Sequence, residues 1–303
     1  NDAPASARRD GLPLQGTPSS VLVAVAFACC LGTSPAVMFG PILPVLKAKL
    51  CLGLVEAALL GACPGLLGSL LRLVAGPLAD SMDQRRMLTA LMALASLGML
   101  GVAVVMGSLE PGLAPHAYWA LLCMGLLAGC GCATFIVGTT QVSYWYPVAS
   151  QGGTLGLLGS VASLSPPLMA HLLPRSLALF GFFRSYAMWT AMLVVGTLMY
   201  NASGHSAWFF QLQGRGLTRE KARLQATALG QELFPPEAAD AMKSFRTAAS
   251  SGQTWALVGL YASGLGGQMT LLGWLPTFWH EAHGLTLEAA GTLTAAFGIT
   301  ACL

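Results

Sequence analysis

Charged side chains are scarce in this sequence. Lys, Arg, Asp and Glu make up only 9% of its 303 residues, whereas hydrophobic residues make up 55%. A soluble domain usually carries about 25% charged residues, so this chain lacks the polar surface that a soluble protein of its length needs. The composition therefore excludes an ordinary soluble protein and predicts an all-α polytopic membrane protein embedded in a lipid bilayer.

The sequence also lacks the patterns of nucleic-acid binding, metal binding and catalysis. The net charge is only +3, and basic residues do not form a stripe interleaved with aromatic residues. Most of the eight cysteines lie inside apolar runs, where cysteine behaves as a small hydrophobic residue. The pair Cys130 and Cys132 has no second pair of metal ligands beside it. We therefore expect no nucleic-acid partner, no metal, no cofactor, no catalytic residues and no enzymatic activity.

Long apolar segments dominate what the sequence does contain. Each is about 20 residues long, which is enough for a helix to cross a hydrocarbon core about 30 Å thick. The expected spans are Val21–Leu46, Leu54–Leu78, Met87–Gly107, Ala117–Gly138, Gln151–Leu173, Phe183–Tyr200, Trp255–Trp274 and a segment that begins at Leu287. The first of these is expected to be interrupted by Gly40-Pro41 and Pro44. Because the sequence stops at Leu303, inside this eighth span, the chain is expected to be truncated.

The spans fall into two groups that are separated by a polar segment rich in Lys and Arg. This segment contains helical stretches that are expected to start near Thr218 and at Pro235-Pro236-Glu237. The predicted organisation is a cytoplasmic tail at 1–20, an N-terminal six-helix membrane half at 21–200, a cytoplasmic linker at 201–252 and the start of a C-terminal membrane half at 253–303.

A short internal repeat supports two related halves. Leu43-Pro44 is followed twelve residues later by Glu56-Ala57-Ala58, and Leu275-Pro276 is followed at the same distance by Glu288-Ala289-Ala290. The offset between the two copies is 232 residues. Each copy joins the end of one span to the start of the next, so spans one and two resemble spans seven and eight. Parallel repeats of this kind occur in transporters built from two six-helix halves.

The distribution of Lys and Arg predicts the orientation of the chain. If the N-terminal tail lies in the cytoplasm and successive spans cross the membrane in opposite directions, the cytoplasmic segments hold ten basic residues and the loops on the other side hold four. Cytoplasmic loops carry the excess of Lys and Arg. We therefore expect a multi-pass protein of the cell (inner) membrane with a cytoplasmic N-terminus.

One arginine lies inside a predicted span. Arg72 is about 8 residues, or roughly 12 Å, from the polar end of the second span. A charge near the middle of the bilayer costs about 2.5–3.5 kcal/mol on insertion scales, which makes it a candidate functional residue.

The conservative interpretation of Arg72 is an ion pair with a carboxylate elsewhere in the bundle. The acidic residues nearest the spans all lie at span ends or in loops: Glu56, Asp80, Glu110, Glu281 and Glu288. An external anion is therefore the better partner. A guanidinium group is planar, permanently charged and offers paired donors, which suits a planar oxyanion held by two hydrogen bonds.

The segment Gly76-Pro77-Leu78-Ala79-Asp80, followed by Arg85-Arg86, resembles the loop motif between spans two and three of the major facilitator superfamily. The resemblance implies the major facilitator fold. The chain would contain the complete first six-helix half and the first two spans of the other half, of which the second is incomplete. It also makes Asp80, Arg85 and Arg86 candidates for a conformational latch at the cytoplasmic face rather than a binding site.

A more specific resemblance is to the nitrate/nitrite porter family within that superfamily. The residues that carry it are Gly68-Ser69-Leu70-Leu71-Arg72, Val142-Ser143-Tyr144-Trp145-Tyr146-Pro147, Gln151-Gly152-Gly153-Thr154-Leu155-Gly156, Leu260-Tyr261 and Gly266-Gly267. The resemblance implies that Arg72 binds the planar anion together with a second arginine that would lie beyond Leu303.

The same resemblance suggests three further substrate-binding residues. Tyr261 matches a tyrosine that hydrogen-bonds the anion, and Phe135 matches an aromatic residue that stacks on it. Ser163 stands where the family usually has asparagine in a glycine-rich run of span five. Without the resemblance, Phe135 would be interpreted as an ordinary packing residue and Ser163 as a small residue at a helix contact.

The leading hypothesis is therefore a monomeric transporter of a small inorganic anion, nitrate or nitrite, that works by alternating access and serves nitrate assimilation. Proton symport usually needs a titratable group in the pathway. The spans present show no buried carboxylate, so anion exchange is favoured. The alternatives are a major facilitator that carries another small or organic anion, and an inactive truncated membrane protein.

Overall fold

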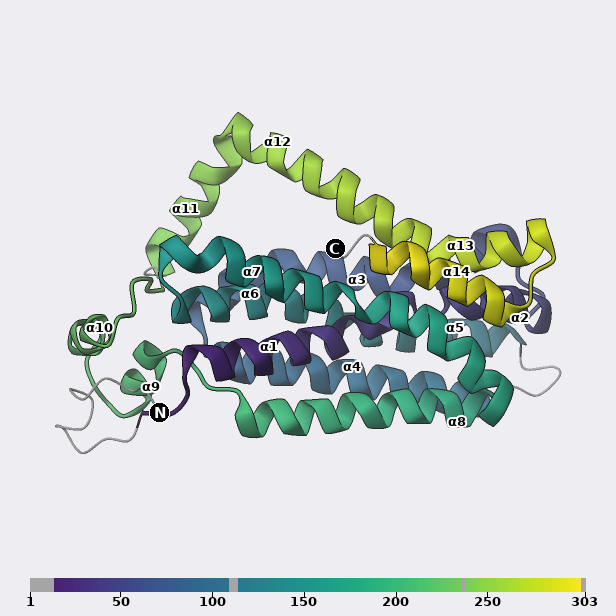
Figure 1. The fold of residues 1–303 in the computed structure, drawn as a ribbon, viewed down its shortest axis with the longest axis horizontal. Helices are drawn as coiled ribbons and strands as arrows, with labels where there is room; N and C mark the ends of the chain where they lie inside the picture. Colours follow the sequence, from purple (N-terminus) through teal and green to yellow (C-terminus); the bar gives the residue numbers. More distant parts are fainter. Residues whose placement is uncertain (1–13, 109–113, 236–237, 301–303) are drawn as a thin grey trace.

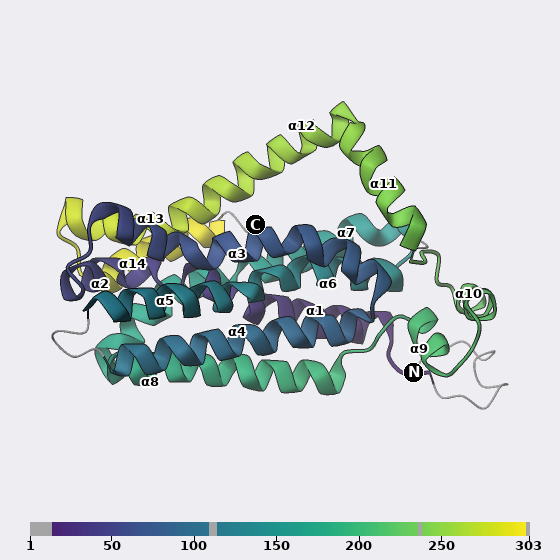
Figure 2. The ribbon, with the colours of Figure 1, turned by 180° about the vertical axis from the view of Figure 1, so that it is seen from behind.

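The computed structural model describes residues 14–108, 114–235 and 238–300. Within these ranges the chain forms helices and turns and no strand. Most helices lie side by side along one direction and form an elongated bundle (Figures 1 and 2). Helices α11 and α12 leave this bundle and stand away from it. The all-α architecture expected from the composition is confirmed.

The first span is broken in its middle. Helix α1 (Pro18–Thr33) is followed by two 3-10 turns, η2 (Ser34–Val37) and η3 (Gly40–Ile42), and then by the short helix α2 (Leu43–Lys49). Both turns have a proline near their start. Proline has no backbone N–H and cannot continue the hydrogen-bonding pattern of an α-helix.

The second span is helix α3 (Leu54–Ser81), and the third is helix α4 (Gln84–Gly107). At the start of α4, the Asp83 side chain accepts a hydrogen bond from the backbone N–H of Arg85.

The fourth span is also broken, which the sequence analysis did not anticipate. It consists of α5 (Ala114–Ala128), the 3-10 turn η4 (Gly129–Ala133) and α6 (Thr134–Trp145). Gly129 and Gly131 lie in this turn, and glycine weakens an α-helix by about 1 kcal/mol relative to alanine.

The fifth and sixth spans follow one another with a single interruption. Helix α7 (Val148–Ser163) continues into α8 (Ser165–Ser203), whose backbone leaves the helical region at Gly181 (φ 77°, ψ 178°). The chain turns back at this end of the bundle (Figure 1). Glycine has no Cβ and therefore adopts this positive φ without strain. The predicted end of span five at Leu173 was placed too early, because the helix continues through Pro174. Membrane helices tolerate proline where neighbouring groups satisfy the freed carbonyl.

The polar linker forms three short helices, α9 (Trp208–Gly214), α10 (Arg219–Ala228) and α11 (Ala238–Ser250). Helix α10 starts at the position expected from Thr218. Helices α9 and α10 share a small apolar cluster of their own, and Trp208 packs edge-on against Trp145 at the end of α6, with ring centroids 5.0 Å apart. The carboxylate of Glu232 accepts a hydrogen bond from the N–H of Val148 at the start of α7. These contacts attach the linker to one end of the first six spans.

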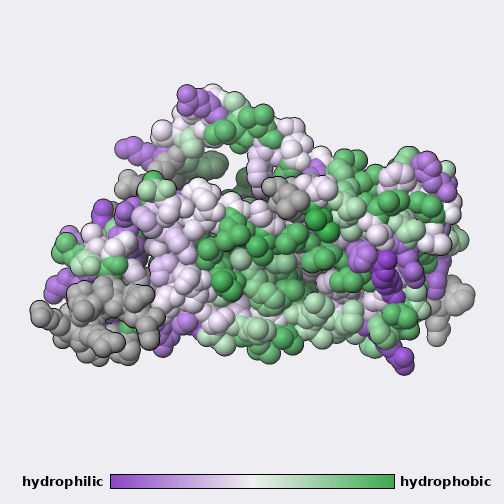
Figure 3. Space-filling model, viewed as in Figure 1, coloured by the Kyte–Doolittle hydropathy of each residue, from purple (hydrophilic) through white to green (hydrophobic). Residues whose placement is uncertain are grey.

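The seventh span consists of α12 (Gly252–Tyr261), a π-helical turn (Ala262–Gly266) and α13 (Gly267–His283), and α14 (Leu287–Thr300) follows. Helix α12 has no buried residue, whereas α13 and α14 pack against the first and fifth spans. Figure 3 shows an opening between α11–α12 and the body of the bundle.

Five segments of the described chain are long and apolar enough to cross a membrane: Pro18–Lys49, Leu54–Asp80, Gln84–Gly107, His116–Trp145 and Val148–Ser203. The last of these contains two crossings, which are joined at Gly181. On the face shown in Figure 3, hydrophobic residues form a broad band across the middle of the bundle, and polar residues gather toward its ends. The surface has the distribution expected of a protein whose sides face lipid.

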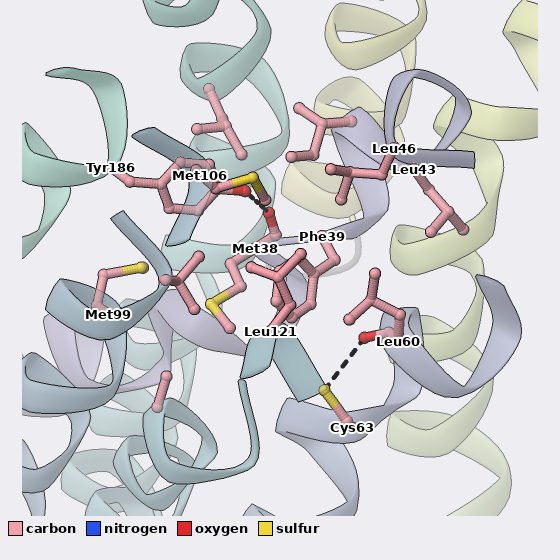
Figure 4. Close-up of a cluster of buried hydrophobic side chains, with 14 of the residues drawn as sticks. Met38, Phe39, Leu43, Leu46, Leu60, Cys63, Met99, Met106, Leu121 and Tyr186 are labelled. Atoms are coloured by element: carbon pink, nitrogen blue, oxygen red, sulfur yellow. Dashed lines mark hydrogen bonds between the residues drawn. The ribbon is translucent and has the colours of Figure 1, made fainter. Parts of the chain in front are cut away.

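The core of the first six spans surrounds the break in span one. Phe39 and Leu43 pack with Leu60, Leu121 and Tyr186, which come from the second, fourth and sixth spans (Figure 4). The Tyr186 hydroxyl donates a 2.7 Å hydrogen bond to the carbonyl of Met38. The broken segment is thus held in position by surrounding spans, and this determines the shape of the cavity beside it.

Candidate functional site

A cavity of about 560 Å³ lies between the first six spans and the seventh. Its walls come from spans one, two, four, five and seven. The lining residues include Thr33, Gly65, Ser69, Arg72, Cys132, Phe135, Ser163, Tyr261, Met269, Thr270 and Trp274. All four residues that the sequence analysis singled out for substrate binding, Arg72, Phe135, Ser163 and Tyr261, line this one cavity.

Arg72 supplies the charge of the cavity. It is half-buried in the middle of α3, and its Nε donates a 3.1 Å hydrogen bond to the carbonyl of Cys132. The guanidinium carbon lies 6.0 Å from the centre of the Phe135 ring. Among the described residues, no carboxylate accepts a hydrogen bond from Arg72, and none supplies an acceptor to its two Nη atoms. Two donor nitrogens of a half-buried cation are therefore available to a ligand.

The other predicted residues occupy different positions on the wall. Phe135 lies near the start of α6, Ser163 ends α7, and Tyr261 ends α12 directly before the π-helical turn. The Tyr261 side chain is 54% exposed. A π-helical turn changes which side chains lie on the same side of a helix, and such turns often occur at functional positions. Here the turn lies directly after Tyr261, and two of its residues, Leu265 and Gly266, line the cavity.

Several lining residues were missed from the sequence. Leu265 and Met269 follow Tyr261 at steps of four residues, which places them along one side of span seven and could have identified them. Cys132 and Thr33 gave no such signal. The Thr33 hydroxyl donates a 2.9 Å hydrogen bond to the carbonyl of Ala162 and so connects the first span to the fifth.

The cavity is closed at the end of the bundle where α2 lies. Helices α13 and α14 pack here against α2, η3 and α8. An ion pair of 3.0 Å joins Lys47 to Glu281, and Arg175 donates a 3.1 Å hydrogen bond to the Thr292 hydroxyl. At the opposite end, α12 diverges from the bundle without burying any residue.

The ion pair contributes little to this closure. The side chains of Lys47 and Glu281 are 36% and 49% exposed, and exposed pairs contribute at most about 1 kcal/mol. We expect Glu281→Gln to change the transport rate by less than about 5-fold, measured as initial flux in proteoliposomes. Glu288→Gln, which removes an exposed carboxylate nearby, is the matched control. A loss of 50-fold or more with Glu281→Gln alone would show that the pair dominates closure.

The three latch candidates do not contact one another. Asp80 accepts a 2.8 Å hydrogen bond from the Tyr144 hydroxyl, Arg85 donates to the carbonyl of Asn201, and Arg86 lies 3.7 Å from Asp83. Each partner belongs to the first six spans or the start of the linker. In the conformation described, Asp80 connects the second span to the fourth, and Arg85 connects the third span to the end of the sixth. A latch between the two halves stays a prediction.

A bundle of six crossings, joined by a linker to the start of a second bundle and enclosing a cavity at the junction, defines a multi-span helical membrane protein with a cavity between its two halves. The described residues contain no group of three or more His, Cys, Asp or Glu that could hold a metal ion.

The chain belongs to the Major Facilitator Superfamily, whose family model matches residues 22–303. The chain is 29% identical over 268 residues to "Probable nitrate/nitrite transporter NarK2" of Mycobacterium tuberculosis, covering 88% of this chain and 59% of that protein. It is 26% identical over 272 residues to "Probable nitrate/nitrite antiporter NarK1" of Thermus thermophilus, covering 88% of this chain and 55% of that protein. The chain thus spans little more than half the length of these relatives, and the resemblance to nitrate/nitrite porters is confirmed.

Two solved structures share the fold. The partially occluded, inward-open conformation of the xylose transporter XylE from E. coli has a TM-score of 0.64 and 13% identity, covering 94% of this chain and 70% of that one. A crystal structure of a D-xylose–proton symporter has a TM-score of 0.56 and 13% identity, covering 94% and 66%. At such low identity these structures establish the major facilitator fold and say nothing about substrate.

Proposed function

We propose that the protein carries nitrate and nitrite across the membrane by alternating access, exchanging one anion for the other. The observation that carries the proposal is Arg72. It lines the cavity, contacts the protein through Nε, and leaves both Nη donors without an acceptor among the described residues. A planar oxyanion can accept two parallel hydrogen bonds from such a group. The relatives named as nitrate/nitrite transporters support this choice of anion.

The other lining residues have complementary roles in this proposal. Phe135 lies beside the guanidinium, where its ring can cover one face of a planar anion. The Tyr261 hydroxyl donates a hydrogen bond from the seventh span, and Ser163 contributes polarity from the fifth. The anion would therefore contact both halves, so its binding would be coupled to their relative movement.

Exchange is favoured over proton symport by the chemistry of the wall. In the described part of the chain, Asp, Glu and His are absent from the cavity lining, and proton coupling usually needs such a group in the pathway.

We further propose that the protein is a monomer of the inner membrane and that its N-terminus is cytoplasmic. Its linker at 201–252 would connect the halves at 21–200 and from 253 onward.

Flux measurements test the substrate and the mode of transport. Protein expressed from its complete gene is reconstituted into liposomes that contain nitrite, nitrate or neither anion. We expect uptake of labelled nitrate only into vesicles loaded with nitrite or nitrate, with no dependence on an imposed pH gradient. Uptake into empty vesicles driven by the pH gradient would contradict exchange. Absence of nitrate uptake under every condition would contradict the choice of anion.

The size of the cavity favours a second candidate, the transport of an organic anion. Its volume of about 560 Å³ falls within the range of about 300–1,000 Å³ that is typical of sites for larger organic ligands. Arg72 would then bind a carboxylate. Competition separates the candidates, because nitrate uptake should be inhibited by nitrite but not by acetate, lactate or citrate at equal concentration. Stronger inhibition by a carboxylate would favour the organic anion.

A further inference from the structure

We propose that the 3-10 turn η4 in the fourth span is a positioning element for Arg72. The carbonyl of Cys132 in this turn binds Nε and thereby directs the two Nη donors to the anion. The proposal rests on the proposed function, because it assigns the turn a role in recognising a planar anion. Cys132 acts through its backbone, so it is a positioning residue and not itself a ligand of the substrate.

One stripe of the second span packs directly onto this turn. Pro64, Gly68 and Arg72 follow one another at steps of four residues and therefore lie on one side of α3. A Cβ atom on Gly68 would lie 2.5 Å from Cβ of Cys132 and 2.6 Å from the carbonyl oxygen of Gly129. A Cβ atom on Gly129 would lie 2.1 Å from the carbonyl oxygen of Pro64. Only glycine on both sides lets the two backbones approach closely enough for the Arg72 hydrogen bond.

The first span holds the opposite side of the turn. A Cβ atom on Gly131 would lie 2.2 Å from the carbonyl oxygen of Gly32, and one on Gly32 would lie 2.5 Å from the Thr134 hydroxyl. The turn is thus clamped between two spans by contacts that involve mainly backbone atoms. Backbone contacts leave little freedom, so the position of the Cys132 carbonyl is fixed before any anion binds.

The consequence for recognition follows from the geometry of arginine. Nε and the two Nη atoms share one plane, so a hydrogen bond at Nε orients the remaining donors. An arginine that is already oriented loses less conformational freedom when it binds a ligand. A planar anion that accepts two hydrogen bonds benefits from this orientation, whereas a spherical anion such as bromide needs only the charge. The turn should therefore strengthen the preference for nitrate over bromide.

Gly68→Ala tests this preference. Dissociation constants for nitrate and bromide are measured on the purified protein from the increase in melting temperature with anion concentration. We expect the variant to bind nitrate about 10-fold more weakly because preorganisation is lost, while bromide binding changes less than about 2-fold. Gly76→Ala in the same helix is the matched control, because its Cβ would meet only Ile136, at 3.9 Å. It should leave both constants unchanged.

The outcomes distinguish this proposal from the proposed function. An equal loss of nitrate and bromide binding in Gly68→Ala, or no loss at all, overturns the positioning role. Wild-type protein that gains no stability from nitrate overturns the proposed function instead.

A second measurement needs neither the variant nor the substrate. In protein labelled with ¹⁵N-arginine, the Nε–H signal of Arg72, assigned by its absence in Arg72→Lys, should exchange with solvent more slowly than those of exposed arginines. Exchange as fast as that of the exposed arginines would overturn the positioning role, even if Gly68→Ala fails to fold.

Discussion

Arg72→Lys is expected to lower nitrate flux about 100-fold, because lysine keeps the charge but cannot offer two parallel donors. One charge-assisted hydrogen bond to the anion contributes about 1.5–3 kcal/mol. Lysine also lacks Nε, so it loses the contact that arginine makes with the carbonyl of Cys132. The measurement is the initial rate of nitrate exchange in proteoliposomes with equal amounts of folded protein.

The control tests whether replacing any arginine of this protein by lysine lowers the flux. Arg184→Lys changes an exposed arginine that does not line the cavity, and its flux should match that of the wild type. If Arg72→Lys retained full flux, Arg72 would be a structural residue and the assignment of the anion would lose its basis. If the variant failed to insert or fold, binding of nitrate to the purified wild type would still test whether the cavity takes the anion.

Gly291→Val is expected to lower exchange up to about 100-fold without abolishing anion binding. A Cβ atom on Gly291 in α14 would lie 2.3 Å from the carbonyl oxygen of Ala170 in α8. A larger side chain here prevents the eighth span from closing against the fifth. Overpacking of this kind costs about 1–3 kcal/mol, and each 1.4 kcal/mol or so corresponds to a factor of about 10 in rate. In the proposed mechanism, closure of this end is one half of the transport cycle, so the variant should accumulate with this end open.

Thiol labelling reports on this change directly. Thr270 lines the cavity and is exposed, so Thr270→Cys in a cysteine-free background supplies the single thiol. A membrane-impermeant thiol reagent applied from the α2 side should label it faster in Gly291→Val than in the parent. Gly76→Val is the control, since the space around Gly76 is open. Unchanged labelling together with unchanged flux would show that the contact between α14 and α8 does not control access.

Several features of the fold could be predicted from local sequence because their causes are local. Low charge and long apolar runs locate the spans, since a helix of about 20 apolar residues satisfies its own backbone inside lipid. Arg72 could be recognised as a functional candidate because a charge inside an apolar run is costly wherever the helix lies. Pro41 and Pro44 indicated the interruption of the first span, because proline cannot continue a helix.

The end of the fifth span shows where local reasoning failed. The fifth span was expected to end at Leu173, directly before Pro174, yet its helix continues to Gly181. Proline disrupts a helix only if the freed carbonyl finds no other partner, and that depends on the neighbouring spans. The partners of the latch candidates also lie beyond local reasoning. Asp80 is close in sequence to Arg85 and Arg86, but its hydrogen-bond partner, Tyr144, belongs to the fourth span.

The sequence by itself thus determined the class of protein, the approximate spans and the identity of the buried cation, since each depends on the free energy of placing one segment in lipid. Only the tertiary structure decided which residues share the cavity with Arg72 beyond those that the family resemblance implied, which end of it is closed, and that the Cys132 carbonyl binds Nε. These features depend on close approaches between backbones that are far apart in sequence, such as Gly68 to Cys132 and Gly291 to Ala170. Helical periodicity assigns a residue to one side of its own helix, but packing against the other helices determines what that side meets.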